Sequence, residues 1–136
     1  MWIFAVVLVA VLLTGAYVRL APSDPARWHV SPKFDRDRNF ANAAVRVIDD
    51  APTRLARLDA IAQDWPRTRT LAGSVGVGMI TYVSRSALWG FPDYTTVHAA
   101  DGKIVLWARS RFGRGDAGVN RERLEAWLAI LRGEDL

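Results

Sequence analysis

Two stretches of the sequence combine charged, glycine and aromatic residues in a way that could recognise a ligand. The first is RSALWGFPDY, residues 85–94, and the second is SRFGRGDAGVN, residues 110–120. An arginine guanidinium pairs in a planar, bidentate manner with carboxylate or phosphate, so the arginines here could converge on an anionic lipid headgroup or a ligand carboxylate. The candidate ligand- or partner-binding residues are Arg85, Trp89, Asp93, Arg109, Arg111, Arg114, Asp116 and Asn120.

The same residues have a structural interpretation that competes with ligand binding. Arg85 could pair with Asp93, and Arg111 or Arg114 could pair with Asp116, which would only fix two loops to a sheet. Trp89 is equally compatible with core packing. Both interpretations stay open at this point.

Catalysis has weaker support in the sequence. A serine (Ser84, Ser86 or Ser110) with His98 and an aspartate could form a triad, but no G-x-S-x-G motif accompanies them. Asp93 and Asp116 could form a carboxylate pair. The chain has no cysteine and only two histidines, which excludes thiolate chemistry and a His-rich metal site. We expect no enzyme activity, no cofactor and no metal.

An uncharged apolar run occupies residues 2–18 and ends at Arg19. It has the length and the flanking aromatic residues, Trp2 and Tyr17, of a single transmembrane helix. A cleaved signal peptide is the alternative, but no Lys or Arg precedes the run. We therefore predict a transmembrane anchor over residues 1–19, a proline-containing linker over 20–42 and a globular domain over 43–136.

The pattern of the globular part predicts an α+β fold with element order β-α-β-β-β-β-α. A strand at 44–48 precedes a helix with Asp50 as N-cap, which ends at Trp65-Pro66. Strands at 68–71 and 79–86 flank a glycine-rich turn, and strands at 94–99 and 103–110 form a hairpin closed by Asp101-Gly102. The last helix has Asp116 as N-cap. Consecutive hairpins imply an antiparallel sheet with both helices covering one face.

The chain resembles the family catalogued as domain of unknown function 1499, which is found in bacteria and plastids. The resemblance rests on TYVSRSALWGFPDYTTV and SRFGRGDAGVNRERLEAWL and covers about residues 44–131. It implies a small domain, often exported or membrane-anchored, with no established activity. The basic residues after the apolar run favour a cytoplasmic domain by the positive-inside rule, whereas the resemblance favours the periplasm.

The net charge and the distribution of arginine along the sequence indicate which class of partner to expect. The net charge is +4, from 16 Arg and 2 Lys against 14 acidic residues, and the mean hydropathy is +0.05. The arginines alternate with aspartates along the chain instead of forming a stripe, which argues against nucleic acid. We expect a single-pass protein of the bacterial inner membrane whose periplasmic domain is a non-catalytic accessory or interaction module of a larger membrane complex. The alternative is a domain that binds a lipid or another hydrophobic or anionic small ligand.

Overall fold

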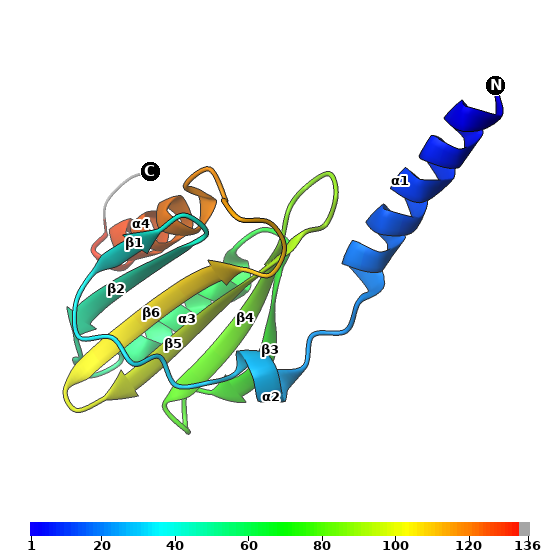
Figure 1. Ribbon diagram of the computed structural model, residues 1–136. Helices are drawn as coiled ribbons and strands as arrows, with labels where there is room; N and C mark the ends of the chain where they lie inside the picture. The colour runs from blue at the N-terminus through cyan, green and yellow to red at the C-terminus, as the bar shows by residue number, and fades with distance from the viewer. Residues whose placement is uncertain (134–136) are drawn as a thin grey trace.

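The computed structural model describes residues 1–133 and confirms the predicted α+β class (Figure 1). Six strands form one antiparallel sheet in the order β1-β2-β6-β5-β4-β3. The elements are α1 (Trp2–Leu20), α2 (Pro25–Trp28), β1 (Arg38–Phe40), β2 (Ala43–Asp49), α3 (Arg54–Asp64), β3 (Thr68–Ser74), β4 (Met79–Arg85), β5 (Pro92–Ala100), β6 (Lys103–Ser110) and α4 (Val119–Leu131). The short edge strand β1 was not predicted, because it lies within the segment interpreted as a linker.

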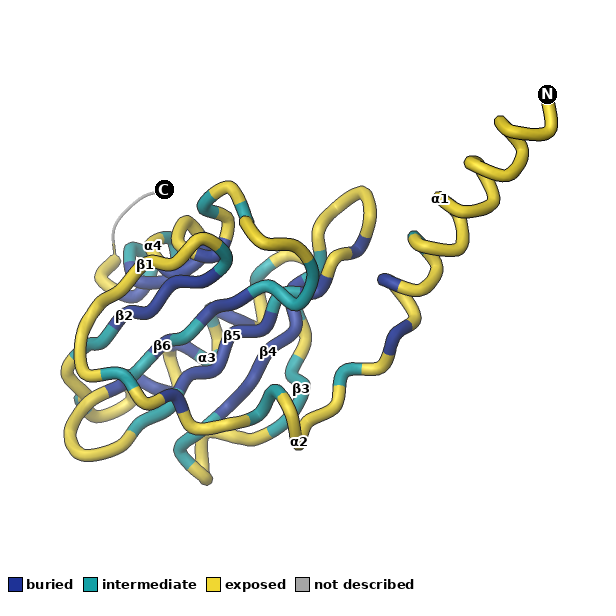
Figure 2. The backbone as a smooth tube through the Cα atoms, viewed as in Figure 1, coloured by how far each residue is buried: buried dark blue, intermediate teal, exposed yellow. Residues whose placement is uncertain are grey.

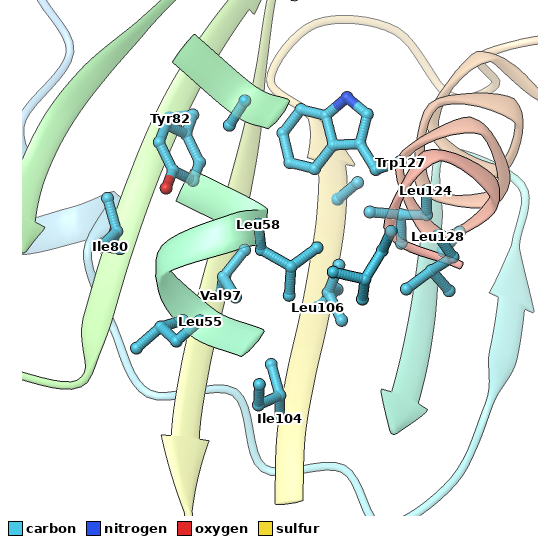
Figure 3. Packing of buried hydrophobic residues seen from close by; sticks show 14 residues of the cluster. Leu55, Leu58, Ile80, Tyr82, Val97, Ile104, Leu106, Leu124, Trp127 and Leu128 are labelled. Carbon is cyan, nitrogen blue, oxygen red and sulfur yellow. The ribbon is translucent and has the colours of Figure 1, made fainter. Parts of the chain in front are cut away.

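The hydrophobic core lies between the sheet and the two helices α3 and α4 (Figure 3). Alternate residues of the strands face the helices, as the two-residue period of a strand requires. Trp127 of α4 is fully buried and packs edge-on against Tyr82 of β4, with ring centroids 5.8 Å apart. Burying one such side chain stabilises the fold by about 1.5–3 kcal/mol. The space between sheet and helices is therefore filled by the chain's own side chains.

The two predicted tight turns are confirmed. Asp101 and Gly102 both adopt positive φ, +55° and +77°, in the hairpin between β5 and β6. A turn with two positive φ angles has a backbone twist that matches the twist of the flanking strands, and an Asp-Gly pair adopts these angles at little energetic cost. The glycine-rich run after β3 is a turn and leads directly into β4 without a helix.

Both predicted helix N-caps are wrong by a few residues. Helix α3 follows Thr53 and α4 follows Gly118, and each of these residues has left-handed φ. Asp50 accepts instead from the neighbouring amide of Ala51 at 2.8 Å. Asp116 lies two residues before the cap position, yet its carboxylate still accepts the amide hydrogens of Gly118 and Asn120. The Asp116 carboxylate therefore accepts hydrogen bonds from backbone amides at the start of α4 that have no partner within the helix.

The other face of the sheet is crossed by the segment that follows α1. In Figure 1 α2 and the chain leading to β1 run across the strands on the side opposite α3 and α4. Phe34 in this segment packs edge-on against Trp107 of β6, with ring centroids 5.5 Å apart. The predicted linker is thus ordered against the sheet along much of its length.

Helix α1 projects away from the domain and is exposed along nearly its whole length (Figure 2). It is the one helix within residues 1–133 that is long and apolar enough to cross a membrane. Because an exposed apolar helix is unfavourable in water, it is a candidate membrane span.

Candidate functional site

Three arginines of the predicted site bond the end of α1 and the chain that follows it to the domain, and we call them the arginine clamp: Arg85, Arg109 and Arg111. Each donates to a backbone carbonyl of the N-terminal part of the chain. Arg85 reaches the carbonyl of Val18 at 3.5 Å, and Arg111 reaches that of Pro22 at 2.8 Å. Arg109 donates to the carbonyl of Trp28. Backbone oxygens of the chain itself thus accept the bonds that the sequence assigned to an anionic ligand.

Arg109 is the most deeply buried residue of the clamp. Its guanidinium donates to the Thr96 hydroxyl at 2.8 Å and to the Trp107 carbonyl at 3.1 Å. It also lies 3.9 Å from the centre of the Trp107 ring, within range for a cation–π contact. Burial lowers the pKa of Arg109 to about 10, so the side chain remains cationic at neutral pH.

A polar and aromatic layer surrounds Arg109 on this face. The Trp28 ring stacks on Tyr94 of β5, with centroids 4.1 Å apart, and the Tyr94 hydroxyl bonds to Ser23 at 2.6 Å. His29 Nδ1 bonds to the Thr81 hydroxyl at 2.8 Å. Burial, followed by the charges of Arg109 and His98, lowers the pKa of His29. This layer therefore favours neutral His29 while holding one buried cation.

The helix-covered face carries a second group of predicted residues, joined by Arg123. Arg123 donates to Asp93 at 3.1 Å and to Asn120 Oδ1 at 2.8 Å. The Asn120 amide nitrogen in turn donates to Asp116 at 2.7 Å and to the Ser110 hydroxyl at 2.9 Å. We call these five residues the helix-side network. It joins the start of α4 to the ends of β5 and β6.

The predicted arginine–aspartate pairs do not form. Asp93 is opposite Ser84 in the sheet and Arg85 is opposite Pro92, so the side chains of Arg85 and Asp93 lie on opposite faces. Asp116 bonds to Asn120 and to backbone amides instead of Arg111 or Arg114. Arg114 lies exposed in the loop before α4.

Arg123, which joins this network, is not among the site residues that the sequence predicted. The residue is buried, with 8% of its surface exposed, next to the fully buried Leu124. Its position three residues after Asn120, on the next turn of the helix, was the available signal.

The residues considered for catalysis are not assembled into a site in the described part of the chain. The Ser84 hydroxyl bonds to Thr68, the Ser86 hydroxyl accepts from the amide of Phe91, and His98 Nδ1 bonds to Ser31. Within residues 1–133 no group of three or more His, Cys, Asp or Glu side chains could hold a metal ion.

Trp89 lies apart from both groups, in the loop between β4 and β5. Its ring packs on α1, 3.6 Å from where a β-carbon of Gly15 would be. Between this loop and α1 runs an apolar groove of about 470 Å³. Its lining residues are Val7, Ala10, Val11, Thr14, Gly15, Val18, Trp89 and Phe91.

Comparison with known proteins places the chain in a family without assigning it an activity. A crystal structure of a DUF4468 family protein from Bacteroides ovatus ATCC 8483 is similar at 15% identity and a TM-score of 0.28, over 65% of this chain and 63% of that one. The chain thus spans less than two thirds of that protein's length. No curated protein matches it. The family model for proteins of unknown function named DUF1499 matches residues 18–131, and the chain belongs to that family.

Proposed function

We propose that this protein is a membrane-anchored, non-catalytic interaction module of a larger complex in the bacterial inner membrane, with its domain in the periplasm. The observation that carries the proposal is the arginine clamp. It bonds Val18, near the end of α1, and Pro22 and Trp28, which follow the helix, to the domain, so the domain is held next to its own membrane helix. A flexible tether would instead let the domain move freely.

A fixed position suits a protein that presents a surface to a neighbour in the same membrane. Conformational entropy lost when a mobile domain docks weakens binding, and a domain already held in place avoids that loss. The apolar groove beside α1 supports this proposal, because a partner's helix could lie there within the bilayer.

The test is to solubilise native membranes in mild detergent and to analyse the tagged full-length protein by native mass spectrometry. We expect a stoichiometric complex with another membrane protein. The double variant Arg109→Met/Arg111→Met should lose that partner, whereas Arg114→Met, in the exposed loop, should keep it. An exclusively monomeric wild-type protein would contradict the proposal.

The periplasmic position of the domain has its own test, which uses the absence of cysteine from the chain. The variant Val77→Cys places a thiol in the exposed turn between β3 and β4. A membrane-impermeant maleimide should label it in intact spheroplasts. Labelling only after the membrane is permeabilised would place the domain in the cytoplasm.

The second candidate function is binding of a lipid or a similar hydrophobic ligand. Tyr82, Trp127 and their neighbours fill the space between sheet and helices, so the groove beside α1 is the place for such a ligand. A monomer that retains one discrete lipid through native mass spectrometry would favour this function over the interaction module.

A further inference from the structure

The loop between β4 and β5, residues 86–91, has the composition of a segment that meets lipid. Its sequence is SALWGF, which contains no charge. Leu88 is 73% exposed, and Trp89 and Phe91 are also exposed. In Figure 1 this loop projects beyond the sheet on the side where α1 departs. Neighbouring apolar side chains left in water in this way mark an interaction surface.

Most backbone carbonyls of the loop have hydrogen-bond partners within the protein, which lowers the cost of a nonpolar environment. Arg19 donates to the carbonyls of Leu88 and Trp89, and Arg85 donates to that of Gly90 at 2.9 Å. The Phe91 carbonyl accepts from the amide of Ser86, and the Gly90 amide donates to the Ser86 carbonyl. Four successive carbonyls, at 88–91, therefore have partners within the protein.

The contact between this loop and α1 sets its depth relative to the candidate span. The 19 residues of α1 extend about 28 Å at 1.5 Å per residue, which is close to the roughly 30 Å of a bilayer's hydrocarbon core. Almost the whole length of α1 is thus needed to cross the hydrocarbon core of the bilayer. Gly15, which lies beside the Trp89 ring, precedes the helix end at Leu20 by about 7.5 Å on the same scale.

Aromatic residues continue this surface beyond the loop. Phe112, in the loop after β6, lies edge-on to Tyr17 of α1, with ring centroids 6.0 Å apart, and its ring is 6.5 Å from that of Phe91. Aromatic side chains of this kind concentrate at the boundary between headgroups and acyl chains.

We propose that the loop at residues 86–91 inserts into the bilayer beside α1 and makes a second membrane contact, with the acyl-chain and headgroup boundary of the lipid as its partner. The inference rests on the part of the proposed function that makes α1 a membrane span. Two contacts, the helix and the loop, then fix the domain with its β4–β5 end toward the membrane.

Because the chain lacks cysteine, single nitroxide labels can test this in the full-length protein. The variants are Leu88→Cys in the loop, Val77→Cys in the turn between β3 and β4, and Leu12→Cys in α1. Their native side chains are similarly exposed, at 73%, 71% and 62%. Each purified variant is reconstituted at high dilution into vesicles of phosphatidylcholine and phosphatidylglycerol. Electron paramagnetic resonance then compares collisions of the label with oxygen, which enters lipid, and with a water-soluble nickel complex.

We expect the oxygen-to-nickel collision ratio at Leu88 and Leu12 to exceed that at Val77 severalfold. A ratio at Leu88 equal to that at Val77, with a high ratio at Leu12, would overturn the loop insertion and leave the membrane anchor intact. Low ratios at all three positions would overturn the span, and with it the membrane part of the proposed function. Circular dichroism of each labelled variant confirms that the fold is retained.

Discussion

Replacing Arg109 by Met should release the segment that follows α1 while leaving the sheet folded. The substitution keeps an apolar stem of similar length but removes a guanidinium that donates to Thr96, Trp107 and Trp28. A hydrogen bond from a charged group contributes about 1.5–3 kcal/mol. Part of this loss is offset, because the variant no longer buries a cation and the Thr96 hydroxyl keeps Thr81 as a partner.

The net destabilisation that we expect is about 2–4 kcal/mol. For a domain of this size, 1 kcal/mol corresponds to roughly 4 °C in melting temperature, so Tm should fall by about 8–16 °C. Thermal unfolding of the full-length protein in detergent, followed by tryptophan fluorescence, measures this change. Arg114→Met, in the exposed loop, should leave Tm almost unchanged.

Hydrogen exchange should locate the effect. Helix α2 has only four residues, which is too short to be stable without tertiary contacts. Its amides at Trp28 and His29 donate to Asp24 and Pro25, and they should exchange rapidly in the Arg109→Met variant while the amides of β5 stay protected. Arg109→Lys keeps the charge but not the planar guanidinium, so its exchange rates in α2 should lie between those of Arg109→Met and the wild type. Unchanged amide exchange in α2 of the Arg109→Met variant would refute the role assigned to the guanidinium. The same holds if Arg109→Lys and Arg109→Met lose equal amide protection.

Three further perturbations test other parts of the structure. Arg123→Met should lower the free energy of unfolding by about 3–5 kcal/mol, because it leaves the Asp93 carboxylate, only 14% exposed, without its cation. Adding Asp93→Asn should restore part of this free energy in thermal unfolding. If the losses of the two single variants are additive in the double variant, the pair does not contribute as proposed. Gly73→Ala should destabilise the protein far more than Gly102→Ala, although both glycines have positive φ. A β-carbon at Gly73 would lie 2.0 Å from the Met79 carbonyl oxygen, whereas one at Gly102 meets nothing within 4 Å. Similar melting temperatures for the two variants would contradict this. His29 has a folded-state pKa below its ordinary value, so its contribution to stability is complete above the unfolded pKa of 6.5 and declines as pH falls below it. Wild type should therefore lose more Tm between pH 7 and pH 5 than His29→Gln, and parallel losses would refute the assignment.

Local sequence patterns were sufficient for the elements that form the core. In α4, Leu124, Trp127, Leu128 and Leu131 follow the i, i+3, i+4, i+7 spacing that is typical of one buried helix face, and all four residues are buried. Asp101-Gly102 predicted its turn because few residue pairs adopt two positive φ angles in succession.

Contacts that depend on the tertiary fold could not be predicted in the same way. The segment at residues 20–42 is rich in proline and charge, which is typical of a linker, yet Trp28 and Phe34 pack on aromatic side chains of the sheet. The partners of Arg85 and Arg111 are backbone carbonyls 67 and 89 residues away along the chain, and no residue type marks a carbonyl as an acceptor. Six of the eight predicted site residues fall into two groups on opposite sides of the sheet, and Trp89 and Arg114 belong to neither.

The preference for arginine over lysine follows from these contacts. Arginine presents five donors in a rigid plane and is weakly hydrated, so one side chain can serve several carbonyls at a partly buried site, whereas a lysine ammonium would have to lose a tightly held water shell. Within residues 1–133 the three clamp arginines form no ion pair with an acidic side chain, because neutral carbonyls take up their donors. Arg85, Arg109 and Arg111 thus place three positive charges where the N-terminal part of the chain meets the sheet.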